Sequence, residues 1–147
     1  MSRSITEVAI GLLSRREHTR LELSRKLRSK GFNDNDIAPA IEQLVANNCL
    51  SDERFTESYI NMRKHKGYGP LRIEQELRER GVDSGLVDEF LDRNNQEWRA
   101  ILQQQYSRKY GNEPVLEYSD RAKRAKFLQN RGFPLDWVFR LTSLDDM

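Results

Sequence analysis

Hydrophobic residues recur at every third or fourth position of this chain, and no stretch of useful length alternates between apolar and polar residues. The first spacing places side chains on one face of a helix, whereas alternation is typical of a half-buried strand. The pattern predicts an all-α protein of about nine helices. In the first third, the expected apolar faces carry Ile5, Val8, Leu12 and Leu13, then Leu23 and Leu27, then Ile37, Ile41, Leu44 and Val45.

The rest of the chain continues with six more faces of the same kind. In the middle third they carry Phe55, Tyr59, Ile60 and Met62, then Ile73 and Leu77, then Val87, Phe90 and Leu91. In the last third they carry Trp98, Ile101, Leu102 and Tyr106, then Ala122, Ala125 and Leu128, then Trp137, Val138 and Leu141. Each face is narrow, so we expect neighbouring helices to stack and bury them together.

Capping signals mark where these helices begin. Ser4-x-x-Glu7 and Thr19-x-x-Glu22 have the spacing of capping boxes, in which a hydroxyl and a carboxylate satisfy the first free N–H groups of a helix. Further helix starts are expected at Asn33 or Asp34, Ser51, Pro70, Asp83, Ser119 and Pro134.

A short phrase occurs three times, as Leu27-Arg28-Ser29-Lys30-Gly31-Phe32, as Leu77 to Val82 and as Leu128 to Phe133. Its glycines are 50 and 51 residues apart. If each glycine ends a helix in the left-handed conformation, the flanking leucine and the following apolar residue make the hydrophobic contact of a Schellman cap. A chance recurrence of glycine would not bring these apolar partners with it.

The repeat predicts three tandem three-helix modules, over residues 1–48, 49–94 and 95–147, that form an elongated, curved array. The alternative is one globular bundle in which the repeats are coincidental. The recurring leucines and apolar residues after the glycines favour the array.

Composition limits the classes of function. The chain has 147 residues, of which 37% are hydrophobic and 33% charged, and no run approaches the 18 or so apolar residues of a membrane span. Its polar N-terminus is unlike a secretion signal, and its single cysteine excludes an internal disulfide. These features predict a cytoplasmic protein with no membrane partner.

The sequence offers no convincing catalytic, cofactor or metal site. His18 and His65 fall in different modules, and neither has a second histidine or cysteine at a metal-ligand spacing. Cys49 precedes Leu50 in an apolar stretch and is expected to be a small packed residue. A binding function is therefore expected, without an enzymatic activity and without a cofactor.

The first candidate binding patch combines Arg63, Lys64, Lys66, Tyr68 and Arg72 around the joint Gly67-Tyr68-Gly69. It would place cations and an exposed aromatic ring at the start of a helix, whose free N–H groups favour phosphates or carboxylates. The alternative is that the cations at the end of the preceding helix only complement its dipole. Tyr68 and Arg72 are not explained by the dipole.

The second candidate patch is Arg121, Lys123, Arg124 and Lys126. With Ala122 and Ala125 facing inward, all four cations would be displayed on one helix. Residues 104–131 hold 7 basic and 3 acidic residues, which favours a contact with phosphates or with an acidic protein surface over a merely solvated helix.

With these residues in view, the chain closely resembles the RecX family of recombination regulators. The segment that carries the resemblance runs from Leu50-Ser51-Asp52-Glu53-Arg54-Phe55 through Tyr59-Ile60, Arg63 and Gly67-Tyr68-Gly69-Pro70-Leu71-Arg72-Ile73 to Glu76-Leu77-Arg78 and Gly81-Val82. The three-module plan extends the similarity over nearly the whole chain.

The resemblance implies a cytoplasmic protein that binds the RecA nucleoprotein filament and restrains ATP hydrolysis and strand exchange in recombination, DNA repair and the SOS response. We expect the chain to act as a monomer. The two basic patches are then candidate contacts with RecA or with single- or double-stranded DNA. One alternative is a direct DNA-binding protein built from repeated helix-turn-helix-like units, although residues 49–96, with 8 basic and 10 acidic residues, argue against it. Another is an inert helical scaffold.

Overall fold

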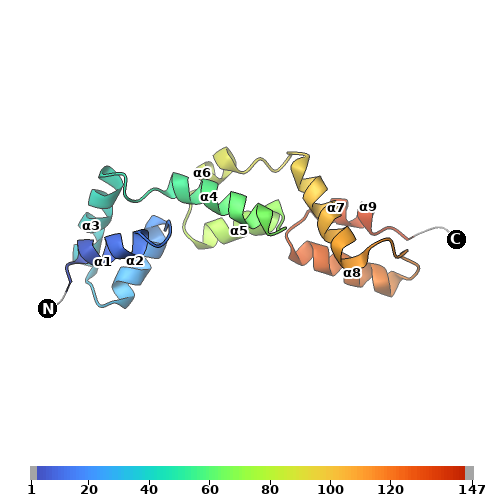
Figure 1. Cartoon of the computed structure of the whole chain (residues 1–147), viewed down its shortest axis with the longest axis horizontal. Helices are drawn as coiled ribbons and strands as arrows, with labels where there is room; N and C mark the ends of the chain where they lie inside the picture. Colours follow the sequence, from blue (N-terminus) through green and yellow to red (C-terminus); the bar gives the residue numbers. More distant parts are fainter. Residues whose placement is uncertain (1–2, 145–147) are drawn as a thin grey trace. The chain divides into compact units, whose positions relative to one another are not determined.

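A computed structural model of the chain describes residues 3–144, and over this range it contains nine helices and no strand (Figure 1). The prediction of an all-α fold is confirmed. The helices are α1 (Ile5–Leu13), α2 (Arg20–Ser29), α3 (Asp34–Ala46), α4 (Asp52–His65), α5 (Pro70–Glu79), α6 (Ser84–Phe90), α7 (Glu97–Tyr110), α8 (Tyr118–Asn130) and α9 (Leu135–Leu141). The elongated, curved array and the three module boundaries stay predictions.

The contacts divide the chain into two compact units. One contains the residues up to Tyr59 together with Leu77–Val87, and the other contains Ile60–Glu76 together with the chain from Asp88 onward. The helices α4, α5 and α6 each contribute residues to both units.

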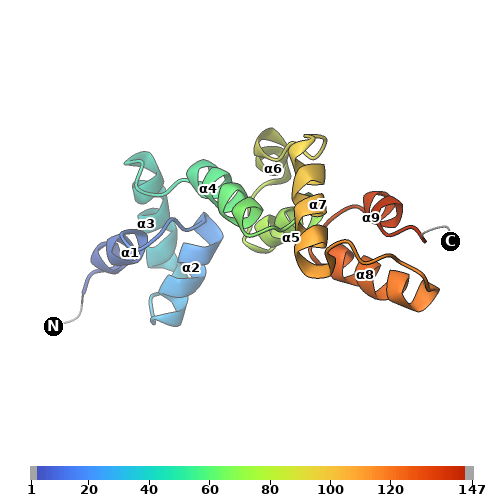
Figure 2. The same cartoon turned by 45° about the vertical axis from the view of Figure 1, so that its right-hand side comes forward.

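The first unit is built around α1, α2 and α3, which pack against one another (Figure 2). Their apolar faces meet in one cluster, so the first three faces are confirmed as predicted. Its buried members are Ala9, Leu23, Leu27, Ile37, Ile41, Leu44 and Leu50.

The second unit has its core between α7, α8 and α9. Its buried members are Leu102, Tyr106, Ala125, Leu128, Phe133 and Val138. Phe133 is the last residue of the third copy of the glycine phrase, so the turn that ends α8 is part of this core.

All three glycine phrases form the predicted Schellman cap. Gly31, Gly81 and Gly132 have φ of 97°, 79° and 101°, in the left-handed region that favours glycine. In each copy the N–H of the next residue donates to the leucine carbonyl five positions earlier, for example from Val82 to Leu77 at 3.0 Å. The equivalent bonds from Phe32 and Phe133 measure 3.2 and 3.4 Å.

Most of the predicted helix starts are also confirmed. The Thr19 hydroxyl accepts from the Glu22 N–H while the Glu22 carboxylate accepts from the Thr19 N–H, which completes the capping box. Ser51 accepts from the Arg54 N–H, and Pro70 is the first residue of α5. The start at Ser119 is wrong, because α8 begins one residue earlier, at Tyr118.

Three side chains do not lie where their patterns place them. Met62 is exposed, although it was expected on the inner face of α4. Ala122 is exposed as well, since the buried face of α8 runs through Ala125 and Leu128. Cys49 is exposed and not packed, because the chain turns at the end of α3 and buries Leu50 instead.

Candidate functional site around Tyr68

The joint between α4 and α5 holds Tyr68 in a fixed position. Gly67 has a φ of 88°, and a Cβ built on it would overlap the Gln105 side chain of α7. The Tyr68 N–H donates to the Arg63 carbonyl at 3.1 Å, which closes the end of α4 in the same way as the three repeated caps. The joint is therefore a packed turn and not a flexible connection.

The start of α5 is capped by the end of α8. The Gly69 N–H donates to the Arg131 carbonyl at 2.7 Å, and the Leu71 N–H donates to the Gly132 carbonyl at 2.9 Å. Two of the N–H groups that were expected to be free for a phosphate at this helix start are therefore already satisfied by the carbonyls that follow α8.

This junction explains two of the glycines. A Cβ on Gly69 would lie 2.5 Å from the Gly132 carbonyl oxygen, and a Cβ on Gly132 would overlap the backbone and Cβ of Arg72. The two segments approach so closely that neither tolerates a side chain.

Three guanidinium groups surround the Tyr68 ring. Their central carbons lie 3.7 Å (Arg63), 4.6 Å (Arg72) and 4.7 Å (Arg131) from the ring centroid, within the range of cation–π attraction. They come from the end of α4, the first turn of α5 and the end of α8. Arg63 and Arg72 were predicted to lie together with Tyr68, and the fold brings them together as expected.

Glu76 is the carboxylate of this cluster. Arg63 makes a two-pronged ion pair with it, with both bonds at 2.9 Å and both side chains about 85% buried, and Arg72 reaches the same carboxylate at 3.3 Å. Arg72 also donates to the Asn130 carbonyl at 2.9 Å. Arg63 is therefore largely committed to holding the fold, whereas Arg72 has a side chain that is 42% exposed.

Lys64 and Lys66, the other two predicted contacts of this patch, differ from each other. Lys64 pairs with Glu97 at 2.7 Å and lies 4.8 Å from the centroid of the Trp98 ring, so it is used within the unit. Its charge lowers the pKa of the Glu97 carboxyl, mainly through their hydrogen bond. Lys66 is exposed.

The second predicted patch does not present all four of its cations. Arg124 is only 3% exposed, because its guanidinium points inward to the Tyr106 hydroxyl, the Glu113 carbonyl and the Asp120 carboxylate. The prediction that Arg124 is displayed on the surface is wrong. Its charge instead fixes the loop that precedes α8, and periodicity cannot show this buried role for an arginine between Lys123 and Ala125.

The other three members of that patch lie nearer the surface. Arg121 is half-buried, with its guanidinium 5.0 Å from the Phe139 ring centroid and a hydrogen bond to the Phe139 carbonyl. Lys123 and Lys126 are exposed. These two lysines and Lys66 are the candidates that are most available to a partner.

Two further cations near these rings, Arg131 and Lys109, were not predicted from the sequence. Arg131 directly precedes the third cap glycine in the chain and contacts Tyr68, while Lys109 lies 4.0 Å from the Phe127 ring centroid. A signal for Arg131 was present, because a basic residue precedes the glycine in all three copies of the phrase, as Lys30, Arg80 and Arg131. No comparable signal marks Lys109.

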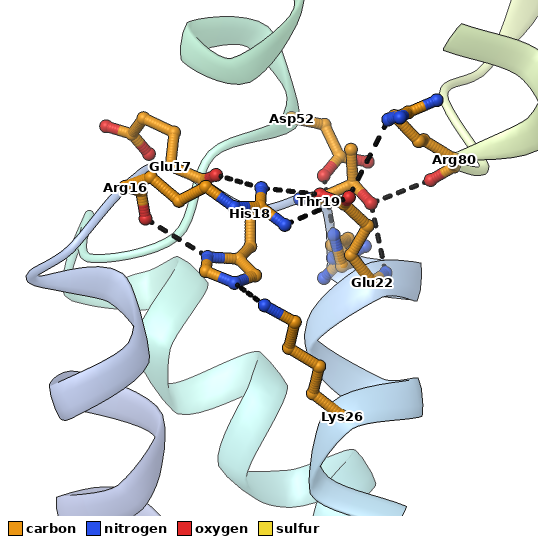
Figure 3. A network of polar contacts seen from close by, with 9 residues as sticks. Arg16, Glu17, His18, Thr19, Glu22, Lys26, Asp52 and Arg80 are labelled. Carbon is orange, nitrogen blue, oxygen red and sulfur yellow. Dashed lines mark hydrogen bonds and ion pairs between the residues drawn. The ribbon is translucent and has the colours of Figure 1, made fainter. Parts of the chain in front are cut away.

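A separate polar network lies in the first unit, around His18 (Figure 3). The His18 ring is buried, with Nδ1 3.0 Å from the Arg16 carbonyl and Nε2 2.9 Å from the Lys26 ammonium. Since Lys26 can only donate, Nε2 accepts and the proton of the neutral ring is on Nδ1. Burial, and then the charge of Arg16, lower the pKa of His18.

The same network binds the second glycine cap. The Thr19 hydroxyl donates to the Arg80 carbonyl at 2.7 Å, and Arg80 reaches the Glu22 carboxylate at 3.7 Å (Figure 3). Burial alone would raise the pKa of Glu22, but hydrogen bonds from Arg16 and from the Thr19 N–H lower it. These contacts serve the fold of the first unit.

Two findings concern other classes of site. In residues 3–144, no group of three or more histidine, cysteine, aspartate or glutamate side chains has an arrangement that could hold a metal ion. Within the same residues, each helix is too short or too polar to cross a membrane.

Comparison with known proteins identifies the family. Residues 51–91 match the second three-helix domain of RecX, and residues 7–44 match the first. The regulatory protein RecX of Pseudomonas entomophila is 40% identical over 144 residues, which cover 98% of this chain and 93% of that protein. The one from Pseudomonas putida strain W619 is 41% identical, over 98% of this chain and 92% of its own length.

The chain belongs to the RecX family. A crystal structure of RecX from Lactobacillus salivarius has the same fold, with a TM-score of 0.74 at 23% identity over 93% of this chain and 91% of that chain. The resemblance inferred from residues 50–82 is thus confirmed, and the Tyr68 cluster is built largely from the segment that matches the second RecX domain.

Proposed function

We propose that this RecX-family protein regulates the RecA recombinase by binding the RecA–DNA filament and restraining ATP hydrolysis and strand exchange. The observation that carries the proposal is the match of nearly the whole chain, at about 40% identity, to proteins named as regulatory protein RecX. The protein acts by binding and supplies no chemistry of its own.

The exposed cations support a contact with a negatively charged assembly. Lys66, Lys123 and Lys126 are exposed, and Arg72 is partly so. A RecA–DNA filament presents both phosphates and protein carboxylates, and contacts from several separate points add through effective concentration. Each contact can therefore be weak while the whole protein binds well.

The test is the rate of ATP hydrolysis by RecA on single-stranded DNA as increasing amounts of the protein are added. The rate should fall at protein amounts below those of RecA, because a regulator bound to a filament affects many subunits. An unchanged rate at every ratio would overturn the proposal. A direct DNA-binding protein, the alternative function, would inhibit only while DNA is limiting and would lose its effect when DNA is in excess.

A matched pair of charge reversals tests whether the Tyr68 cluster lies on the surface that contacts the filament. Lys66 and Lys30 are both exposed lysines that directly precede a glycine with positive φ, but only Lys66 adjoins the Tyr68 cluster. Lys66→Glu should weaken inhibition of the RecA ATPase by about 3- to 10-fold in half-maximal concentration, and Lys30→Glu should leave it unchanged. Equal effects of the two variants would remove the Tyr68 cluster from the contact surface.

A further inference from the structure

A pocket lies between α7 and α9 in the second unit. The core of this unit joins both helices to α8, and a cavity of about 270 Å³ remains between them. We call it the α7–α9 pocket. Its walls are Arg99, Leu102 and Gln103 of α7 and Trp137, Arg140 and Leu141 of α9.

The volume of the pocket limits what it can hold. Sites for drug-sized ligands and cofactors measure roughly 300–1,000 Å³, so a cavity of about 270 Å³ is small for a nucleotide or a cofactor. It is large enough for one long side chain. A suitable ligand is therefore a short stretch of a larger molecule that inserts one group.

The walls of the α7–α9 pocket combine apolar and positively charged groups. Leu102 is only 4% exposed, and Trp137 and Leu141 are partly buried and pack against the core of the unit. Arg99 and Arg140 are exposed. An apolar centre is thus flanked by one guanidinium group from each of two helices.

The charge of these two arginines is not neutralised within the described chain. No acidic side chain lines the pocket. Among residues 3–144, neither Arg99 nor Arg140 forms an ion pair, although Asp136 lies one turn before Arg140 on α9. Other arginines of the second unit do pair with carboxylates, namely Arg63, Arg72, Arg93 and Arg124. Both pocket arginines are therefore available to an acidic ligand.

The position of Arg99 argues against a nucleobase in the pocket. Its guanidinium carbon lies 4.8 Å from the centroid of the Trp137 ring, so a base would have to displace it to stack on that face. Leu102 and Leu141 also offer nothing to a phosphate. An aliphatic side chain can contact both leucines while Arg99 stays in place.

We propose that the α7–α9 pocket binds an acidic peptide segment of a partner protein, in which one large aliphatic side chain is flanked by carboxylates. The aliphatic side chain lies against Leu102 and Leu141, and the carboxylates pair with Arg99 and Arg140. This is the usual arrangement of a protein interface, with an apolar centre and a charged rim. The inference does not depend on RecA, and its test contains none.

The two tryptophans of the chain provide the measurement. The full chain, labelled with ¹⁵N, is titrated with the amidated peptide Ser-Glu-Leu-Glu-Ser, raised to several millimolar because so small a contact gives weak affinity. The indole N–H signal of Trp137 should shift. That of Trp98, which is buried and donates to the Asp92 carbonyl at 2.7 Å, should stay in place. A titration that moves neither indole, or moves both equally, would overturn the proposal.

Two altered peptides separate the apolar contact from the charged ones. Serine in place of leucine should lower the affinity by about 10-fold or more, because burial of the aliphatic side chain is lost. Glutamine in place of both glutamates should lower it by about 10-fold, from about 3-fold for each exposed ion pair. If the peptide without leucine binds as well as the first one, the pocket does not receive an aliphatic side chain.

A matched pair of double variants tests the arginines. R99Q/R140Q should weaken peptide binding by about 10-fold. The control R25Q/R108Q also removes two exposed arginines, one on α2 and one on the opposite side of α7 from Arg99, and should keep the parent affinity. R99K/R140K retains both charges and should keep most of the affinity, even if R99Q/R140Q melts at a lower temperature. Equal affinities of R99Q/R140Q and R25Q/R108Q would overturn the proposal.

A competition experiment distinguishes a peptide from a nucleic acid. An oligothymidylate of about 15 nucleotides, added to the protein with bound peptide, should leave the shift of the Trp137 indole unchanged. Displacement of the peptide by the oligonucleotide would make the pocket part of a phosphate-binding surface and would overturn the proposal. The regulation of RecA, which is measured separately through ATP hydrolysis, does not depend on either result.

Discussion

The glycine caps that end α2 and α8 have the same local structure and different surroundings. Gly31 and Gly132 have φ of 97° and 101°, and both are followed by a phenylalanine that closes the cap. A Cβ on Gly31 would meet no atom within 4 Å, whereas one on Gly132 would overlap the backbone of Arg72. The repeated phrase thus encodes the way in which a helix ends. Whether that end also packs against a second helix depends on tertiary contacts.

Gly81 lies between these two cases. A Cβ there would lie 2.6 Å from the Leu21 Cδ2, the end of a flexible side chain, and 2.7 Å from the Leu21 Cβ, which is fixed to the backbone. Its neighbour Arg80 accepts from the Thr19 hydroxyl at the start of α2, just as Arg131 accepts from the Gly69 N–H at the start of α5. In both joints a helix cap contacts the first turn of an earlier helix.

Among the three glycine variants, Gly132→Ala should lose the most free energy of unfolding. The variant combines the strain of a left-handed alanine, about 1–2 kcal/mol, with a backbone overlap that only separation of α8 from α5 can relieve. We expect a total loss of more than about 3 kcal/mol in the free energy of unfolding of the second unit, measured by urea denaturation.

Hydrogen exchange localises this loss. The Gly69 and Leu71 amides donate to the Arg131 and Gly132 carbonyls, so they should exchange faster in Gly132→Ala. Gly31→Ala is the control, with almost the same φ and no overlap, and should cost only the strain of about 1–2 kcal/mol. Equal losses for the two variants would mean that the joint contributes nothing.

Gly81→Ala should have an intermediate effect. Rotation of Leu21 moves its Cδ2 away from the new methyl group but leaves its Cβ in place, so a small shift of the start of α2 is also needed. We expect a loss of about 2–3 kcal/mol, made of the left-handed strain and the repacking cost. Thermal melts monitored by circular dichroism would show it. A loss as large as that of Gly132→Ala would contradict the distinction between an overlap with side-chain atoms alone and an overlap that includes backbone atoms.

The smallest expected effect is a pH dependence confined to the first unit. The folded protein holds His18 neutral, so below about pH 6.5 the unfolded chain binds more protons than the folded one. Stability should therefore fall as the pH drops from about 6.5 towards the lowered pKa of His18, and should not change through this group at higher pH. Protonation would place a second cation beside Lys26.

His18→Gln is the informative variant for this prediction. Its amide can accept from Lys26 and donate to the Arg16 carbonyl without titrating, so the dependence of the melting temperature on pH between 5 and 7 should flatten. A variant with the same pH dependence as the parent would show that another group is responsible.

The fold could be predicted from the sequence wherever one residue type has a single structural use. The left-handed glycines, the Thr19 capping box and Pro70 at a helix start are of this kind, and all were placed correctly. Arginine has several uses, which is why the sequence placed Arg124 on the surface when it is buried beside Asp120. Alanine tolerates both environments, so Ala122 gave no reliable orientation to that helix.

The candidate site was predicted only as far as it is local in the sequence. Arg63, Tyr68 and Arg72 lie within ten residues and were grouped from the chain alone. Arg131 contacts the Tyr68 ring and Lys109 contacts the Phe127 ring. Both contacts depend on how α8 and α7 pack, and periodicity within one helix cannot show such long-range contacts. The same limit hid the use of the α5 N–H groups by α8.

The junction between α8 and α5 also makes two helix ends open together. The carbonyls that terminate α8 are the acceptors that cap α5, so fraying of the last turn of one helix removes the cap of the other. Neither end can loosen at the low cost that a solvent-exposed terminus has. The final turn of α8 is in this sense cooperative with the first turn of α5, although about 60 residues separate the two in the chain.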